Sequence, residues 1–137
     1  MAISASKRLA VFNRFLGRCG YCGARMLFPQ ATVDHIHPRY LEDTYAGGHI
    51  DEERNLMPCC RRCNKWKSTL TLEKFRAEIE AQLERLMRDS AQFRLAIDFG
   101  LVRPTRAVAR VQFYFERHAP DFKRKRVTII HDDEEEV

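Results

Sequence analysis

Apolar residues repeat at the spacing of an amphipathic helix near the N-terminus. Leu9, Phe12 and Leu16 form one stripe, and Ser4 or Ser6 can cap the helix that carries it. The pattern therefore predicts a first helix that ends near Leu16.

Similar stripes recur in the second half of the chain. Thr71 can cap a long helix whose apolar members are Leu72, Phe75, Ile79, Leu83 and Leu86. Another helix is expected over residues 91–99, with Gly100 at its end.

Short segments between these helices have the pattern of strands and turns. Residues 25–28 and 31–36 predict two strands around Pro29, and Pro38 ends the second. Residues 39–54 are polar and predict a loop.

Three further segments complete the predicted elements. A short helix is expected over residues 61–68, after a turn that contains cysteines. Residues 108–115 are rich in β-branched and aromatic side chains and predict a strand, although Val108, Val111 and Phe115 also fit a helix. Residues 126–130 could pair with that strand.

Composition limits the class of protein. A chain of 137 residues with 45% hydrophobic residues is long enough for one compact domain. It contains no apolar run of about 20 residues, the length that a membrane span requires, so we expect no membrane association. Residues 1–7 lack the apolar run of a secretory signal, and we therefore expect a cytoplasmic protein.

Charge is distributed unevenly. The net charge is +5, and residues 132–136 are five consecutive acidic residues. The rest of the chain has 24 basic and 14 acidic side chains, a net charge of +10. A protein that basic attracts polyanions such as nucleic acid. The acidic end is expected to be a solvated tail.

Four of the five cysteines form two C-x-x-C pairs. Cys22 and Cys60, the inner members, are separated by 37 residues. Two such pairs supply the four thiolates of a closed tetrahedral zinc site, which would be structural. The predicted ligands of one Zn²⁺ per chain are Cys19, Cys22, Cys60 and Cys63. Cys59 could replace Cys60 as a ligand, or it could be a small buried hydrophobic residue beside the site.

The residues between the two pairs suggest chemistry on phosphodiesters. The sequence Asp34-His35-Ile36 is followed by Asn55-Leu56, and then by Asn64 and Lys67 after the second pair. Histidine has the ordinary pKa that suits removal of a proton from water near neutral pH. A divalent cation can neutralise the charge that builds on the phosphate oxygens.

The order and spacing of these residues, from Cys19 to Lys67, resemble the HNH endonucleases in which two C-x-x-C pairs bracket the motif. The resemblance implies an α+β fold, with a small ββα-metal core stapled by zinc and a helical C-terminal extension. It covers about a third of the chain. We expect the core over residues 1–70, the extension over 71–131 and the acidic tail over 132–137.

The resemblance also implies roles for individual residues. It implies a DNA endonuclease in which His35 is the general base, with Asp34 and Asn64 as ligands of a catalytic divalent metal. Asn55 would brace the loop and hold His35 in position. Many family members have histidine where this chain has Asn64; the amide oxygen beside a carboxylate favours Mg²⁺ or Mn²⁺.

Basic residues on the predicted helix over 61–68 are candidates for contact with DNA. We expect Lys67 to contact a phosphate, and Trp66 to face the zinc site and the core. In a regular strand, Asp34 and His35 would face opposite sides, so they share one site only if the strand twists or ends there.

Two alternatives remain open from the sequence. The chain could be a zinc-containing DNA-binding module without catalysis, which would shift the mobility of plasmid DNA without relaxing it. The apolar helix over 72–86 and the aromatic residues 113–115 could form the seam of a homodimer, but packing within the core explains them equally well.

Overall fold

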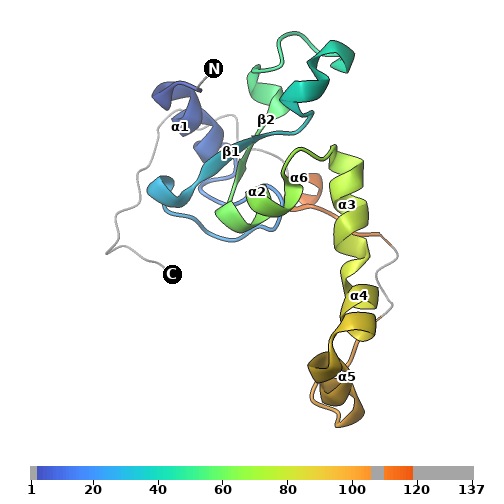
Figure 1. The fold of residues 1–137 in the computed structure, drawn as a ribbon. Coiled ribbons are helices and arrows are strands. Elements are labelled where there is room, and N and C mark those ends of the chain that lie inside the picture. The colour runs from blue at the N-terminus through green and yellow to red at the C-terminus, as the bar shows by residue number, and fades with distance from the viewer. Residues whose placement is uncertain (1–2, 106–109, 119–137) are drawn as a thin grey trace. The chain divides into compact units, whose positions relative to one another are not determined.

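The computed structural model describes residues 3–105 and 110–118, which fall into two compact units (Figure 1). The first, which we call the cysteine unit, comprises residues 3–72 and 112–118. The second, which we call the helical unit, comprises residues 73–105 with 110 and 111. Among the described residues, no helix has the length and apolar character that a membrane crossing needs.

Helix α1 (Ala5–Asn13) begins the cysteine unit. Its cap is Ser4, whose hydroxyl accepts a hydrogen bond of 3.2 Å from the Lys7 amide, as predicted. The helix ends before Leu16, which has a φ of +56° and is 50% exposed. The predicted apolar stripe was therefore wrong at that residue.

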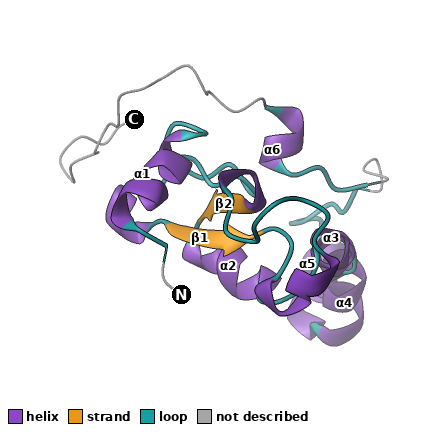
Figure 2. Ribbon diagram, turned by 90° about the horizontal axis from the view of Figure 1, so that it is seen from above, coloured by secondary structure: helices purple, strands orange, loops and turns teal. Residues whose placement is uncertain are grey.

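A two-stranded antiparallel hairpin lies beside this helix (Figure 2). Strand β1 (Thr32–His35) pairs with β2 (Leu56–Cys59), with Thr32 opposite Cys59 and His35 opposite Leu56. The prediction of β1 is confirmed.

The strand predicted before β1 was wrong. Residues 25–28 form no strand: Arg25 makes one isolated bridge to Arg18, and Phe28 begins a single 3-10 turn with Pro29. Proline restricts φ and donates no hydrogen bond, which favours that turn. Pro58 lies inside β2, where its carbonyl accepts from the Gly20 amide at 2.8 Å.

Helix α2 (Arg61–Lys67) completes the ββα arrangement and packs against β1. Cys60 caps it, because its sulfur accepts from the Cys63 amide at 3.4 Å. The predicted α+β fold with a small ββα core is therefore confirmed.

The chain returns to the cysteine unit at residues 112–118, where α6 (Tyr114–Arg117) follows Phe113. The amides of Tyr114 and Phe115 donate to the carbonyls of Tyr21 and Gly20, at 2.9 and 2.8 Å. The predicted strand is wrong for residues 110–115. The aromatic side chains of Phe113 and Phe115 pack against Tyr21, in the turn between Cys19 and Cys22. Residues 106–109 and 126–130 lie outside the described part of the chain.

Three helices form the helical unit: α3 (Leu72–Glu80), α4 (Gln82–Asp89) and α5 (Ala91–Asp98). The single long helix predicted from Thr71 is divided at Ala81, which separates α3 from α4. Ser90 caps α5 by accepting from the Phe93 amide at 3.1 Å. The helical character predicted for the C-terminal region is thus confirmed in these residues.

Candidate active site and zinc site

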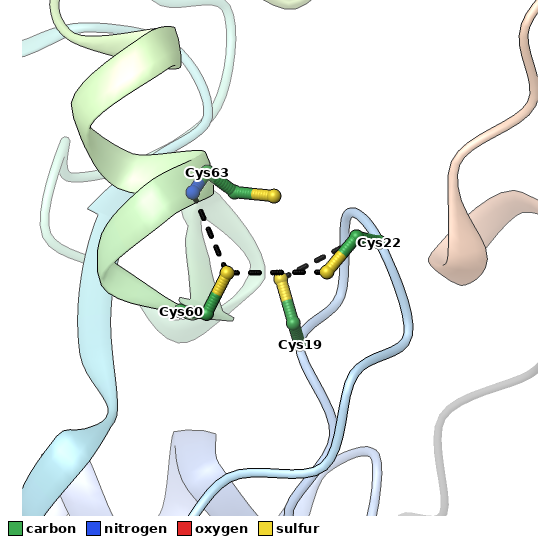
Figure 3. Close-up of side chains that lie close together, drawn as sticks. All are labelled: Cys19, Cys22, Cys60 and Cys63. Carbon is green, nitrogen blue, oxygen red and sulfur yellow. Dashed lines mark hydrogen bonds between the residues drawn. The ribbon is translucent and has the colours of Figure 1, made fainter.

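The two C-x-x-C pairs meet at one point (Figure 3). One pair lies in the turn after α1, and the other spans the cap and first turn of α2. All four sulfur atoms lie within 4.8 Å of one another, and those of Cys22 and Cys60 are 3.9 Å apart. A tetrahedral site with Zn–S bonds of about 2.3 Å requires sulfur atoms roughly 3.8 Å apart. The cluster therefore fits zinc.

Protonation of the thiols also favours a bound cation. A hydrogen bond from Cys63 lowers the pKa of Cys19 to about 5, and the same bond raises the pKa of Cys63. Burial raises the pKa of Cys22. Four thiolates this close repel one another, so a bound cation such as zinc would stabilise the deprotonated cluster.

Cys59 is not part of this cluster. It is completely buried on β2, and its sulfur lies 3.2 Å from the Thr32 hydroxyl. Burial raises the pKa of this thiol well above its ordinary value. Cys59 is therefore a small buried residue beside the site and not a replacement for Cys60. Cys60 is the fourth member of the cluster.

Asp34 is buried on β1, with 6% of its surface exposed. One carboxylate oxygen, Oδ2, accepts from the Tyr21 hydroxyl at 2.6 Å and lies 2.9 Å from Lys67 Nζ. Burial raises the pKa of Asp34, while the charge of Lys67 and the two hydrogen bonds oppose that rise. Tyr21 lies in the turn between Cys19 and Cys22, two members of the cysteine cluster. The turn that carries these two cysteines therefore also positions the Asp34 carboxylate.

Lys67 is fully buried at the end of α2. Besides its ion pair with Asp34, its ammonium donates to the backbone carbonyl of His35 at 2.9 Å. The sequence predicted that Lys67 contacts a phosphate; in the structure its ammonium joins two neighbouring residues of β1, Asp34 and His35.

Strand β1 ends at His35, and the His35 side chain has a partner different from those of Asp34. Its Nε2 atom lies 2.6 Å from Oδ1 of Asp51, and both side chains are only about one-sixth exposed. Asp51 was absent from the predicted site, since nothing in the sequence of a 20-residue loop indicates which acid folds back onto β1.

Asn55 is buried directly before β2 and binds the backbone that follows His35. Its amide oxygen accepts from the His37 amide at 2.8 Å. Its amide nitrogen donates to the carbonyls of His37 and Ile50, at 3.2 and 2.8 Å. These bonds hold both ends of the loop between the strands.

Asn64 lies on α2 and lines an open pocket of about 380 Å³. The other lining residues are polar or basic: Thr32, Arg61, Lys65 and Ser68. Within the described residues, no hydrogen bond joins Asn64 to Asp34. Trp66 on the same helix is 55% exposed, so the prediction that it faces the core was wrong.

Comparison with known families bears on this arrangement. Residues 19–69 match the family model of the HNH endonuclease. The resemblance seen in the sequence is therefore confirmed, and the match contains every predicted site residue. It supports nuclease activity in general terms.

A solved structure is similar to part of the chain. It is the Type II-C Cas9 enzyme from Actinomyces naeslundii, with 28% sequence identity and a TM-score of 0.45. The similarity covers 58% of this chain and 8% of the Cas9 chain. No match was found among curated proteins.

Two further residues of the cysteine unit were missed by sequence reasoning. Tyr21 had no predicted role, yet its hydroxyl donates to Asp34. Arg14 is buried and donates to the backbone carbonyls of Glu53 and Leu56, which fixes α1 against the start of β2. Neither role has a local signal, because the partners lie 13 to 42 residues away.

Proposed function

We propose that this chain is a metal-dependent DNA endonuclease that hydrolyses phosphodiester bonds. The observation that carries the proposal is the HNH family match over residues 19–69, which contains the Asp34, His35 and Lys67 arrangement. The basic balance of residues 1–131 supports nucleic acid as the substrate.

His35 is the general base of this proposal. A water oxygen forms a bond to phosphorus, the bond from phosphorus to the 3′ oxygen breaks, and the imidazole accepts the proton that the water loses. Asn55 supports this role through its bonds to the backbone of His37, which limit movement of the chain just after His35.

Asp34 and Asn64 are the proposed ligands of Mg²⁺ or Mn²⁺. Tyr21 and Lys67 both bind Oδ2 of Asp34, and no described residue donates a hydrogen bond to Oδ1, so one carboxylate oxygen is available. Carboxylate and amide oxygens are hard ligands suited to these ions. When bound, the cation would neutralise the charge that builds on the phosphate and the leaving oxygen.

Lys67 is proposed to position the two neighbouring residues of β1. Its ammonium fixes one oxygen of Asp34 and the carbonyl of His35 at once. The pocket beside Asn64 supplies the contact with DNA, because Arg61 and Lys65 there are exposed cations that can bind backbone phosphates.

Relaxation of supercoiled plasmid in Mg²⁺ tests this function. The wild type should nick the plasmid, and His35→Ala should lower the rate by about 10²–10⁴ because a general base is lost. Equal zinc content and equal DNA binding in the two proteins would show that the variant is folded. If His35→Ala nicks the plasmid at the wild-type rate, His35 is not the general base.

One observation favours a second candidate, a non-catalytic zinc-containing DNA-binding module. Lys67 forms an ion pair of 2.9 Å with Asp34 and so already neutralises part of the carboxylate charge that would bind a metal. Such a module would retard the plasmid in a gel with any divalent ion and leave it supercoiled.

A further inference from the structure

The loop between β1 and β2 brings one acidic side chain onto His35. Oδ1 of Asp51 lies 2.6 Å from Nε2 of His35, although the two residues are 16 positions apart. Their side chains are 16% and 15% exposed, so little water competes for the contact. This is the distance of a strong charge-assisted hydrogen bond.

The Asp51 carboxylate is held from several directions. The guanidinium of Arg39 donates to both of its oxygens, at 3.2 and 3.4 Å. The hydrogen bond with His35, and then that with Arg39, lower the pKa of Asp51. The group facing the imidazole is therefore an anion, and an anion accepts but cannot donate.

The backbone around Asp51 is fixed without help from the carboxylate. Its amide donates to Nδ1 of His49 at 3.0 Å, and its carbonyl accepts from Lys7 Nζ at 2.9 Å. The preceding residue, Ile50, is bound by Asn55. Removal of the carboxylate should therefore leave the loop in place and take away only the partner of His35 and Arg39.

An anionic acceptor at Nε2 determines which ring nitrogen carries the proton. With the proton on Nε2, the lone pair of the neutral imidazole is on Nδ1. Among the described residues, none forms a hydrogen bond with Nδ1. That nitrogen is therefore free to accept a hydrogen bond from a water molecule.

We propose that Asp51 is a positioning residue for His35, holding the imidazole with its proton on Nε2 so that Nδ1 is the nitrogen that accepts the proton from water. This inference rests on the proposed function only for its kinetic consequence. The contact between the two side chains can be tested without any cleavage.

The experiment compares the full-length wild type with Asp51→Ala, Asp51→Asn and Asp43→Ala. Asp43 is a matched control, because it is an exposed aspartate in the same loop. Zinc content and the thermal melt of each protein report whether it is folded.

Proton NMR of ¹⁵N-labelled protein provides the first readout. The wild type and Asp43→Ala should each show a downfield N–H resonance of His35 Nε2 that exchanges slowly with water, assigned by its loss in His35→Ala. Asp51→Ala should lack this resonance. Its survival in Asp51→Ala would overturn the proposal.

Steady-state nicking provides the second readout. Asp51→Ala should lower kcat by about 10–100-fold, the usual effect of losing a residue that orients a functional histidine, with KM nearly unchanged. Asp51→Asn should be affected less, since its amide oxygen can still accept from Nε2–H. A wild-type kcat in Asp51→Ala, or a change in KM alone, would contradict a positioning role.

The two readouts separate this inference from the proposed function. If the wild type does not nick, the function fails, and the N–H resonance alone decides whether Asp51 orients His35. If the wild type nicks and the resonance is absent from it, the function stands and the inference about Asp51 is wrong.

Discussion

The cysteine unit and the helical unit use their polar side chains differently. In the cysteine unit, Arg14, Asp34, Asn55 and Lys67 are buried, and each binds a partner at least 5 residues away. In the helical unit, the described ion pairs are mostly exposed and several are local, such as Arg88 with Asp89; the buried Arg76, paired with Glu73, is the exception.

Apolar side chains differ in the same way. Of the described residues in the helical unit, only Phe75 and Arg76 are buried, while Phe99 and Leu101 are 75% and 80% exposed. Buried polar groups are costly unless every one is satisfied. We therefore expect a substitution in the cysteine unit to destabilise the whole of that unit. We expect a substitution in the helical unit to change stability little.

Loss of zinc should have the largest effect. Cys60→Ser removes one of four ligands, so the variant should lose its metal and the fold of the cysteine unit, because the cluster joins the turn after α1 to α2. Metal analysis should give about one zinc per wild-type chain. Cys59→Ala is the control and should retain the zinc. A metal-free protein with an unchanged melt would contradict the structural role of the site.

Substitution of Asn64 should remove activity without unfolding the protein. Asn64→Ala should lose nicking under Mg²⁺, because the proposed metal site loses an oxygen ligand. Asn64→His should shift the preference toward Ni²⁺ or Co²⁺, since imidazole is a softer donor. The control Gln92→Ala changes an exposed amide of the helical unit and should nick at the wild-type rate.

Nicking rates against a panel of divalent ions would check these expectations. Full activity of Asn64→Ala in Mg²⁺ would exclude Asn64 as a ligand. A wild type that prefers Ni²⁺ or Zn²⁺ would have the same consequence.

Substitution of Arg14 should destabilise the fold by an intermediate amount. Arg14→Ala removes two hydrogen bonds from a buried guanidinium to backbone carbonyls, and we expect the free energy of unfolding to fall by about 2–4 kcal/mol. Arg85→Ala removes the exposed pair with Glu78 and should leave that free energy nearly unchanged. Urea denaturation of the holoproteins measures both. Equal losses of unfolding free energy in Arg14→Ala and Arg85→Ala would contradict the difference that we infer between the two units.

Substitution of exposed apolar residues should have the smallest effect. Phe99→Ser and Leu101→Ser should change the free energy of unfolding by no more than about 0.5 kcal/mol, because these side chains remain largely in water. Their melts and nicking rates should overlay those of the wild type. A loss comparable to that of Arg14→Ala would mean that these residues pack against something in solution.

The sequence predicted those parts of the site that depend on short spacing. The cysteine pairs, strand β1 and helix α2 were found because their ligands, alternation and caps lie within a few residues. Strand β2 was not predicted, since Pro58 has no amide donor and therefore argues against a strand. The contacts of Tyr21, Arg14 and Asp51 depend on tertiary folding, and no local pattern contains them.

The nicking rate of supercoiled plasmid in Mg²⁺ by wild type and His35→Ala, at equal bound zinc and equal DNA binding, tests the central claim most directly. We expect the wild type to relax the plasmid and His35→Ala to be slower by about 10²–10⁴. A wild type that binds the plasmid and leaves it supercoiled would contradict the claim that this chain is a nuclease.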